Sequence, residues 1–284
     1  MIKSAAQLKD YIKNLARLKN ANPQILLRMY MMERFLERLS LSKYKNNFIM
    51  KGGTLVASMV GVDLRATMDL DVTIKGFTLS IEETKEIIIN ICSLHNEDNI
   101  RFTVKDISNI MDEADYNGLR VSMLAEYERI SIPLKIDIST GDVITPQAIE
   151  YQYKLLLEDR YIELLSYNLE TVLAEKFDTI VERDISNTRM RDFYDIYVLI
   201  QIYRKQFQPE VFSKAVAATA SQRKSSHLYN ELNNILNSVY ASKDLQQLWS
   251  RYGKNYQYAS DIAWNDVVAS LQILTNYIDQ FDNI

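Results

Sequence analysis

One stretch of the chain decides the fold: Lys51-Gly-Gly-Thr54, followed by Arg65-Ala-Thr-Met-Asp-Leu-Asp71. The apolar residues 48–50 precede the first motif and predict a short strand, and residues 55–60 predict a helix after it. Paired glycines let the backbone turn tightly and approach a ligand closely. The N–H groups that begin a helix favour an anion. The alternative for this motif is a plain turn, with Thr54 as the helix N-cap.

The second motif lies in residues 65–74, whose alternation predicts a strand. Asp69 and Asp71 would then lie side by side, about 6–7 Å apart at the backbone. Mg²⁺ suits such a pair, because it takes one or two carboxylates and completes its shell with water and phosphate oxygens. A solvated strand face is the alternative. The residues expected on one face are Arg65, Thr67, Asp69, Asp71 and Thr73.

A third carboxylate lies in Leu134-Lys-Ile-Asp-Ile138, where the alternation places Lys135 and Asp137 on one face of another strand. If this strand neighbours the Asp69/Asp71 strand, three carboxylates can hold two metals for an in-line phosphoryl displacement. Asp137 could also accept the proton of the attacking hydroxyl. The alternative is a surface ion pair between Lys135 and Asp137.

The remaining pattern predicts an α+β fold, with a mixed sheet flanked by helices in residues 1–167 and an α-helical C-terminal domain in residues 168–284. A hairpin is expected about Glu128-Arg129. The other expected strands are 100–107, 118–128, 131–139 and 161–167. The expected helices are 4–19, 23–39, 81–95, 168–183, 191–206, 209–220, 226–240 and 258–281.

Composition limits the classes of protein and of site. The chain has 284 residues, 47% of them hydrophobic, which is ample for one large or two modest domains. We expect a cytoplasmic protein without a membrane partner, because no signal-peptide or membrane-spanning pattern occurs and the single Cys92 reads as a packed thiol. His95 and His227 lack metal-ligand spacing, which argues against a zinc site or a His-based triad. The net charge of -4 does not indicate a nucleic-acid partner, although a local basic face would suffice.

The order of the motifs resembles the polymerase-β-like nucleotidyltransferase fold. The strings K-G-G-T and R-x-T-x-D-L-D, with Lys135-Ile-Asp137, resemble more specifically the AbiEii family of bacterial nucleotidyltransferase toxins. The A-E-K and R-D-x-x-D motifs of that family match Ala174-Glu-Lys176 and Arg191-Asp-Phe-Tyr-Asp195. The matches run from Lys51 to Asp195.

The later motifs have their own physical reading. Lys176 lies along the apolar stripe of its helix, so its ammonium must snorkel, pair, or reach into a site such as a nucleotide phosphate. Asp192 and Asp195 begin the next helix, where acidic residues complement the dipole. With Arg191 beside them, they could instead orient Lys176 or the substrate.

The resemblance implies a toxin of a bacterial toxin–antitoxin and phage-defence system, using an NTP and Mg²⁺ or Mn²⁺. Related members transfer nucleotides to the 3′ end of tRNA and block translation, so an RNA acceptor and a cognate antitoxin are the expected partners. Asp69, Asp71 and Asp137 would hold the metal and, with Lys176, form the catalytic set. The residues expected to bind nucleotide or substrate are Gly52, Gly53, Thr54, Arg65, Thr67, Lys135, Lys176, Arg191, Asp192 and Asp195.

Two other functions stay open. Nucleotide transfer to a small-molecule or protein hydroxyl is compatible with the acidic net charge, and a non-catalytic NTP-binding protein would retain the pocket without turnover. An RNA acceptor would need a basic surface. Its candidate residues, which otherwise read as solvated helix faces, are Arg183, Arg189, Arg191, Arg204, Lys205, Arg223 and Lys224.

Overall fold

The computed structural model describes residues 2–77, 80–110 and 118–278. The chain divides into two compact units, each described by itself below. The first comprises Met1–Asp142 and Ala148–Tyr167, and the second comprises Val143–Gln147 and Asn168–Ile284. The expected domain boundary after residue 167 stays a prediction.

The first unit is built on a mixed sheet, which has seven strands within the described residues and the order β3-β4-β5-β2-β1-β7-β6. Strand β2 pairs in parallel with β5, and β1 pairs in parallel with β7, while the other neighbours are antiparallel. The strands are β1 Phe48–Met50, β2 Leu70–Ile74, β3 Arg101–Ile110, β4 Gly118–Tyr127, β5 Ile130–Thr140, β6 Ile149–Lys154 and β7 Tyr161–Ser166. The helices are α1 Ala5–Leu18, α2 Pro23–Leu41, α3 Gly52–Val60 and α4 Ile81–Cys92.

Local sequence explains the longest part of this sheet. Buried and half-buried residues alternate along β4, as a strand with one covered face requires. Tyr127 pairs with Ile130 across the two-residue turn Glu128-Arg129, so the predicted hairpin is confirmed. The α+β fold class is confirmed as well.

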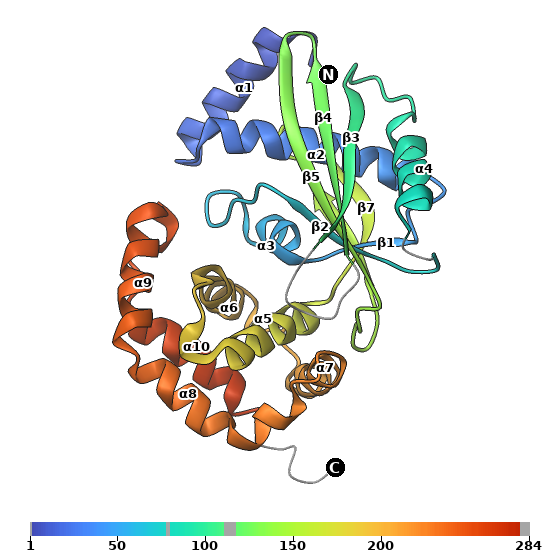
Figure 1. The fold of residues 1–284 in the computed structure, drawn as a ribbon. Helices are drawn as coiled ribbons and strands as arrows, with labels where there is room; N and C mark the ends of the chain where they lie inside the picture. The colour runs from blue at the N-terminus through green and yellow to red at the C-terminus, as the bar shows by residue number, and fades with distance from the viewer. Residues whose placement is uncertain (1, 78–79, 111–117, 279–284) are drawn as a thin grey trace. The chain divides into compact units, whose positions relative to one another are not determined.

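Helix α2 runs beside the strands of the sheet (Figure 1). Its buried charged residues hold two connections of the sheet. It contacts β5 and β7, and Asn22 caps its first turn. Arg38 donates to both oxygens of Asp98 at 2.7 Å, just before β3. Arg34 lies 2.8 Å from Glu158 in the β6–β7 turn. Helix α2 thus holds both the segment before β3 and the β6–β7 turn through side-chain contacts.

The second unit is helical in its described part. Helix α5 packs against α6 and α7, and α6 packs against α9 and α10. Asn168 caps α5 by accepting from the Thr171 N–H at 2.8 Å, and it also donates to the Thr145 carbonyl. The elements are α5 Leu169–Arg183, η1 Asp184–Ser186, α6 Met190–Tyr203, α7 Pro209–Gln222, η2 Ser226–Glu231, α8 Leu232–Ala241, α9 Lys243–Asn255, η3 Gln257–Ala259 and α10 Trp264–Thr275.

Five elements differ from the sequence expectations. Residues 65–69 precede β2 instead of extending it, and the chain bends at Met68-Asp69, where the Asp69 carbonyl accepts from the Thr54 and Thr67 hydroxyls. Strand β6 and helix α9 were not expected. The expected helices 226–240 and 258–281 each begin with a short 3-10 turn or loop, and the second ends at Thr275. Residues 279–281 of that prediction lie outside the described residues.

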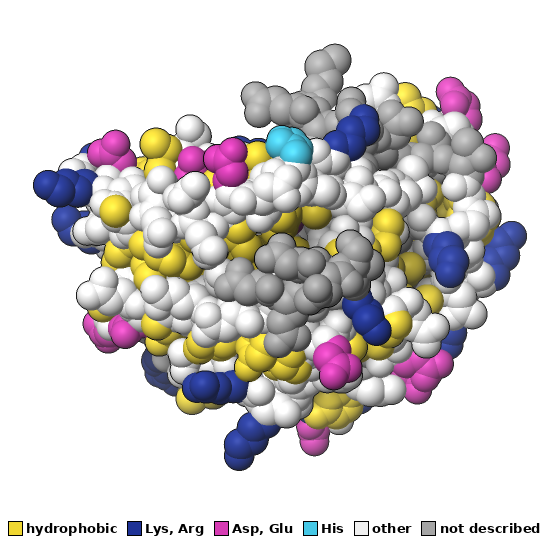
Figure 2. Space-filling model, turned by 90° about the horizontal axis from the view of Figure 1, so that it is seen from below, with side chains coloured by type: hydrophobic (Ala, Val, Ile, Leu, Met, Phe, Trp, Pro, Cys, Tyr) yellow, Lys and Arg dark blue, Asp and Glu magenta, His cyan; other side chains and the backbone are white. Residues whose placement is uncertain are grey.

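Surface charge is mixed on the face that Figure 2 shows. Lys and Arg side chains there lie between Asp, Glu and apolar side chains and do not gather in one broad basic area. Among the described residues, the helices are too short or too polar for any to cross a bilayer.

Glu33 on α2 should make stability depend on pH. Burial raises its pKa from 4.5 to about 8, against the attraction of Arg34 and the Leu156 N–H. The folded state therefore holds the proton more tightly, so the stability contributed by this group is present below pH 4.5 and is lost as the pH rises towards 8. Glu33→Gln, which keeps the acceptor for the Leu156 N–H at 2.7 Å, should raise the urea midpoint more at pH 8.5 than at pH 4.5.

Glu97→Gln is the control for this measurement, because Glu97 is exposed. It should shift the midpoint equally little at both values of pH. An equal shift for Glu33→Gln at both values would contradict the prediction.

Candidate active site

The glycine turn lies against the carboxylate of Asp71. Gly52 begins α3 with a φ of +60°, which L side chains rarely adopt. A Cβ on Gly52 would lie 2.8 Å from the Cβ and Cγ of Asp71. Gly53 donates its N–H to Asp71 Oδ2 at 3.0 Å. The turn is therefore glycine both for its backbone conformation and for its closeness to Asp71.

The next three site residues pack behind this turn. A Cβ on Gly53 would lie 3.2 Å from the Arg65 guanidinium and from Thr67 Oγ1, both buried. Thr54 donates its hydroxyl to the Asp69 carbonyl at 2.7 Å, and Thr67 donates to the same oxygen at 3.2 Å. Thr54 lies inside α3, so it is not the N-cap, and its hydroxyl shapes the bend that carries Asp69.

Parallel pairing of β2 and β5 places Asp71 directly beside Asp137. Neighbouring strands lie about 4.8 Å apart, so the two carboxylates project from adjacent positions. Asp69 lies in the bend just before β2 and is not on the strand face expected for it. The expected row of five residues on one strand is therefore wrong, although both aspartates remain beside the glycine turn.

The pKa of Asp71 is raised in this environment. Burial raises it to about 6, with the nearby charges of Asp137 and Asp69 adding to the rise. The Gly53 N–H and Lys51 oppose it. A cation beside Asp71 would relieve the repulsion among the three carboxylates.

Arg120 is the partner of Asp137. It lies opposite Asp137 in the β4–β5 ladder, and donates from Nε and Nη2 at 2.7 and 2.6 Å. Lys135 is exposed and lies across from Ser122. The sequence reading considered Lys135 as the ion-pair partner and missed Arg120. Counting equal steps back from the Glu128-Arg129 turn would have placed Arg120 there.

Lys51 and Asp142 form a second ion pair near Asp71. Lys51 Nζ lies 2.6 Å from Asp142, whose carboxylate also accepts from Ser139 Oγ at 2.5 Å. Burial acts to raise the pKa of Asp142, but Lys51, Ser139 and Thr73 together lower it. Asp142 follows β5 after Gly141, and no motif pointed to it.

The donor set fits one or two carboxylate ligands for a divalent ion. Within residues 2–77, 80–110 and 118–278, no group of three His, Cys, Asp or Glu side chains is arranged to hold a metal. Asp69 and Asp71 alone suit Mg²⁺, which usually keeps several waters and takes substrate phosphates. The assignment of Asp137 as a third ligand stays a prediction.

The second unit places the later motifs in one cluster. Lys176 is 9% exposed, and its Nζ lies 2.6 Å from Asp195 and 3.2 Å from Asp192. Asp195 is fully buried. The two carboxylates therefore pair with Lys176 and fix its ammonium, which agrees with the alternative that Asp192 and Asp195 orient Lys176. Arg223, a candidate for a basic surface, donates instead to the Glu175 carbonyl and Thr179.

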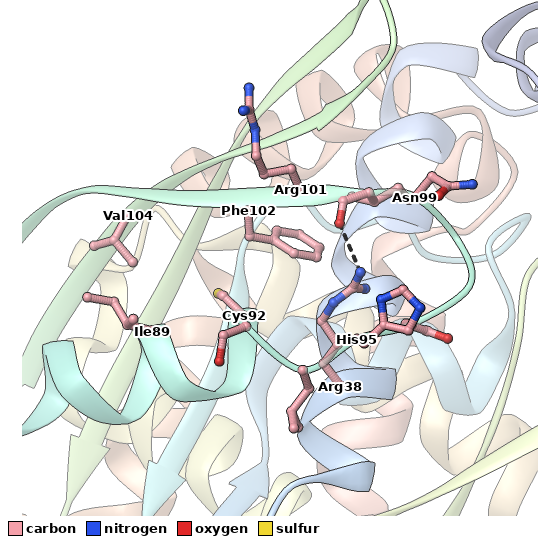
Figure 3. Close-up of a pocket in the computed structure, with 12 residues that line it drawn as sticks. Arg38, Ile89, Cys92, His95, Asn99, Arg101, Phe102 and Val104 are labelled. Atoms are coloured by element: carbon pink, nitrogen blue, oxygen red, sulfur yellow. Dashed lines mark hydrogen bonds between the residues drawn. The ribbon is translucent and has the colours of Figure 1, made fainter.

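A cavity of about 400 Å³ lies elsewhere in the first unit, between the end of α4 and β3 (Figure 3). Arg38 lines it, with its guanidinium bound to Asp98 and to the Ile100 carbonyl at 2.9 Å. Burial raises the pKa of the Cys92 thiol to about 12, against Arg38, so Cys92 is a neutral packed thiol. The expected site residues do not line this cavity.

Gly52→Ala should damage the site. The left-handed conformation alone costs an L residue about 1–2 kcal/mol, and the new Cβ would also push Asp71 away. We expect a lower free energy of unfolding, measured in urea, together with a loss of Mn²⁺ binding measured by calorimetry.

Gly76→Ala is the matched control, because Gly76 also has a positive φ but its Cβ would meet only Asn47, at 3.3 Å. It should lose stability and keep Mn²⁺ binding. If the two variants bind the ion equally well, the close contact between Gly52 and Asp71 is irrelevant to the site.

Solved structures that are similar to this chain share little sequence with it. Among solved structures, JHP933 from Helicobacter pylori is 15% identical, with a TM-score of 0.48, over 91% of this chain and 95% of that chain. A nucleotidyltransferase-like antigenic protein from Paracoccidioides brasiliensis is 14% identical, with a TM-score of 0.37, over 72% and 91%. ANT(2″)-Ia in complex with adenylyl-2″-tobramycin is 15% identical, with a TM-score of 0.37, over 72% and 98%.

No curated protein matches the sequence. The model of the family described as "Nucleotidyl transferase AbiEii toxin, Type IV TA system" matches residues 34–270, which is most of the chain. This protein therefore belongs to the AbiEii nucleotidyltransferase toxin family.

Proposed function

We propose that this protein transfers nucleotides from an NTP to the 3′-hydroxyl of an RNA, with tRNA as the acceptor. Blocked translation is the proposed result, and a cognate antitoxin and a role in phage defence are proposed with it. The observation that supports this most directly is the register of β2 and β5, which places Asp137 beside Asp71 and the glycine turn. Family membership supports the reaction class.

In the proposed reaction the RNA 3′-oxygen attacks the α-phosphorus of the NTP. The new O3′–P bond forms as the bond from the α-phosphorus to the bridging oxygen breaks, and pyrophosphate leaves. The hydroxyl proton passes to a carboxylate, for which Asp137 is the candidate. Arg120 orients Asp137 through its two hydrogen bonds.

A divalent ion, Mg²⁺ or Mn²⁺, would supply charge stabilisation at the phosphoryl oxygens. Asp69 and Asp71 are the residues proposed to hold it. Lys51, fixed by Asp142, is proposed to neutralise triphosphate charge, together with the glycine turn. Lys176, Arg191, Asp192 and Asp195 remain proposed substrate-binding residues.

Label transfer tests the reaction. With α-labelled NTPs, Mg²⁺ and total tRNA, the wild type should label RNA, whereas Asp69→Asn and Asp71→Asn should reduce the rate by at least about a hundredfold, as removal of preorganised charge does. Asp106→Asn is the matched control, because Asp106 is exposed on β3, and it should keep the rate.

Three outcomes would overturn this proposal. Unchanged transfer by the Asp69 and Asp71 variants would show that the carboxylates are not the site. Labelling that survives RNase, without added tRNA, would favour a small-molecule or protein hydroxyl as the acceptor. NTP binding without pyrophosphate release would identify a non-catalytic binder.

Metal binding should weaken in acid. Since the pKa of Asp71 is about 6, a proton competes with the ion below that pH. Calorimetric titration should give Mn²⁺ affinity about tenfold lower at pH 5 than at pH 8, because one pH unit below the pKa displaces most of the ionised form. Affinity that does not change between these values would exclude Asp71 as a ligand.

A further inference from the structure

The second unit carries a cluster of tyrosines between α6 and the end of α9. The Tyr252 and Tyr256 ring centroids lie 4.6 Å apart, and Tyr256 and Tyr258 are stacked at 5.4 Å with 27° between their planes. Beneath them, the buried Tyr194 of α6 lies 4.7 Å from Tyr258. The buried ring and α6 hold the outer rings in place.

The cluster is exposed on one side only. Tyr194 and Tyr252 are buried, whereas Tyr256 and Tyr258 are half-buried. Packing of α9 against α6 accounts for the inner rings, which fill the core. It does not require two further stacked rings at the surface. We call Tyr256, Tyr258 and Arg191 the stacking surface.

Arg191 completes this surface. It is exposed in the first turn of α6, and its guanidinium lies 5.8 Å from the centre of the Tyr256 ring. It donates to the Tyr256 hydroxyl at 3.2 Å, so the ring orients the guanidinium. The next residue, Asp192, pairs with Lys176. A cation thus stands beside an aromatic stack, next to the proposed substrate-binding cluster.

Stacked tyrosine rings beside a guanidinium suit unpaired nucleotides. Unpaired bases stack on tyrosine rings and guanidinium planes, and arginine pairs with the phosphates between them. Bases inside a duplex cannot reach such a surface because both of their faces are covered. The exposed Arg189 adds positive charge near Arg191. Tyrosine and arginine also recur at protein interfaces. Here two exposed arginines, Arg189 and Arg191, lie beside the rings and next to proposed substrate-binding residues, which favours single-stranded nucleic acid.

We propose that the stacking surface binds unpaired nucleotides of the acceptor RNA, with bases on Tyr256 and Tyr258 and a phosphate on Arg191. This inference rests on the proposed RNA acceptor. It identifies a binding surface for the acceptor in the second unit and predicts a preference for single-stranded RNA.

The test is fluorescence anisotropy with labelled single-stranded and duplex RNA, the full chain, no NTP, and a series of salt concentrations. Wild type should bind the single strand more tightly than the duplex. Tyr256→Leu, which keeps the bulk and removes the ring, should weaken single-strand binding about tenfold without changing its salt dependence. Arg191→Gln should also lower the slope of log affinity against log salt by about 0.7, the loss of one phosphate contact.

Matched variants separate the surface from general effects. Tyr256→Phe keeps the ring for stacking and loses only the hydroxyl that accepts from Arg191, so it should bind single strands more tightly than Tyr256→Leu. Tyr277→Leu changes another half-buried tyrosine of this unit, and Lys214→Gln removes an exposed charge on α7, so neither should affect binding. Circular dichroism checks that each variant is folded, and NTP affinity should be unchanged in the Tyr256 variants.

The outcomes distinguish the two proposals. If wild type transfers label to RNA but Tyr256→Leu binds single strands as tightly as wild type, the stacking surface is wrong and the proposed function stands. If wild type binds single strands through this surface but never labels them, the function is wrong and the surface stands. Equal affinity for duplex, or no RNA binding by wild type, overturns the surface and leaves a protein partner as its occupant.

Discussion

The contact of Asp71 with the glycine turn is the constraint on which the candidate site depends. The Gly53 N–H donates to the carboxylate, and Gly52 leaves no atom where a Cβ would overlap it. Asp71 thereby joins the start of α3 to β2, and the parallel pairing of β2 with β5 adds Asp137. Burial and the neighbouring carboxylates raise the pKa of Asp71, as is common for functional carboxylates.

The surroundings hold this group in place. On β4, Arg120 fixes Asp137 with two hydrogen bonds, and Asp142 fixes Lys51. Away from the site, the buried charges of α2 connect the segment before β3 and the β6–β7 turn to the sheet. Buried ion pairs contribute little net stability but are costly to break singly, so they specify position more than they stabilise. A rigid sheet suits the proposed nucleotide transfer, because such catalysis rests on positioning.

Family membership gives the reaction class, whereas side-chain geometry bears on the proposed substrates. The family match covers both units and gives the reaction class of a nucleotidyltransferase toxin. Lys176 with its two aspartates, and the tyrosines beside Arg191, belong to the second unit alone. Their proposed roles differ: Lys176 and its two aspartates are proposed to bind substrate, whereas the half-buried stacked rings of Tyr256 and Tyr258 are proposed to bind bases. The choice of acceptor would therefore depend on the surface of the second unit more than on the carboxylates of the first unit.

The sequence by itself determined the strand, glycine turn and helix within residues 48–60, the β4–β5 hairpin and the family, because these depend on local periodicity and short motifs. It predicted that the strand begins at residue 65, because alternation cannot show the bend at Met68-Asp69 that precedes β2. It missed α9, whose buried residues are few among polar ones. Only the tertiary structure decided that β5 lies beside β2 and that Tyr256 meets Arg191. Those pairings join residues far apart in the chain, and their energy comes from long-range packing that no local pattern encodes.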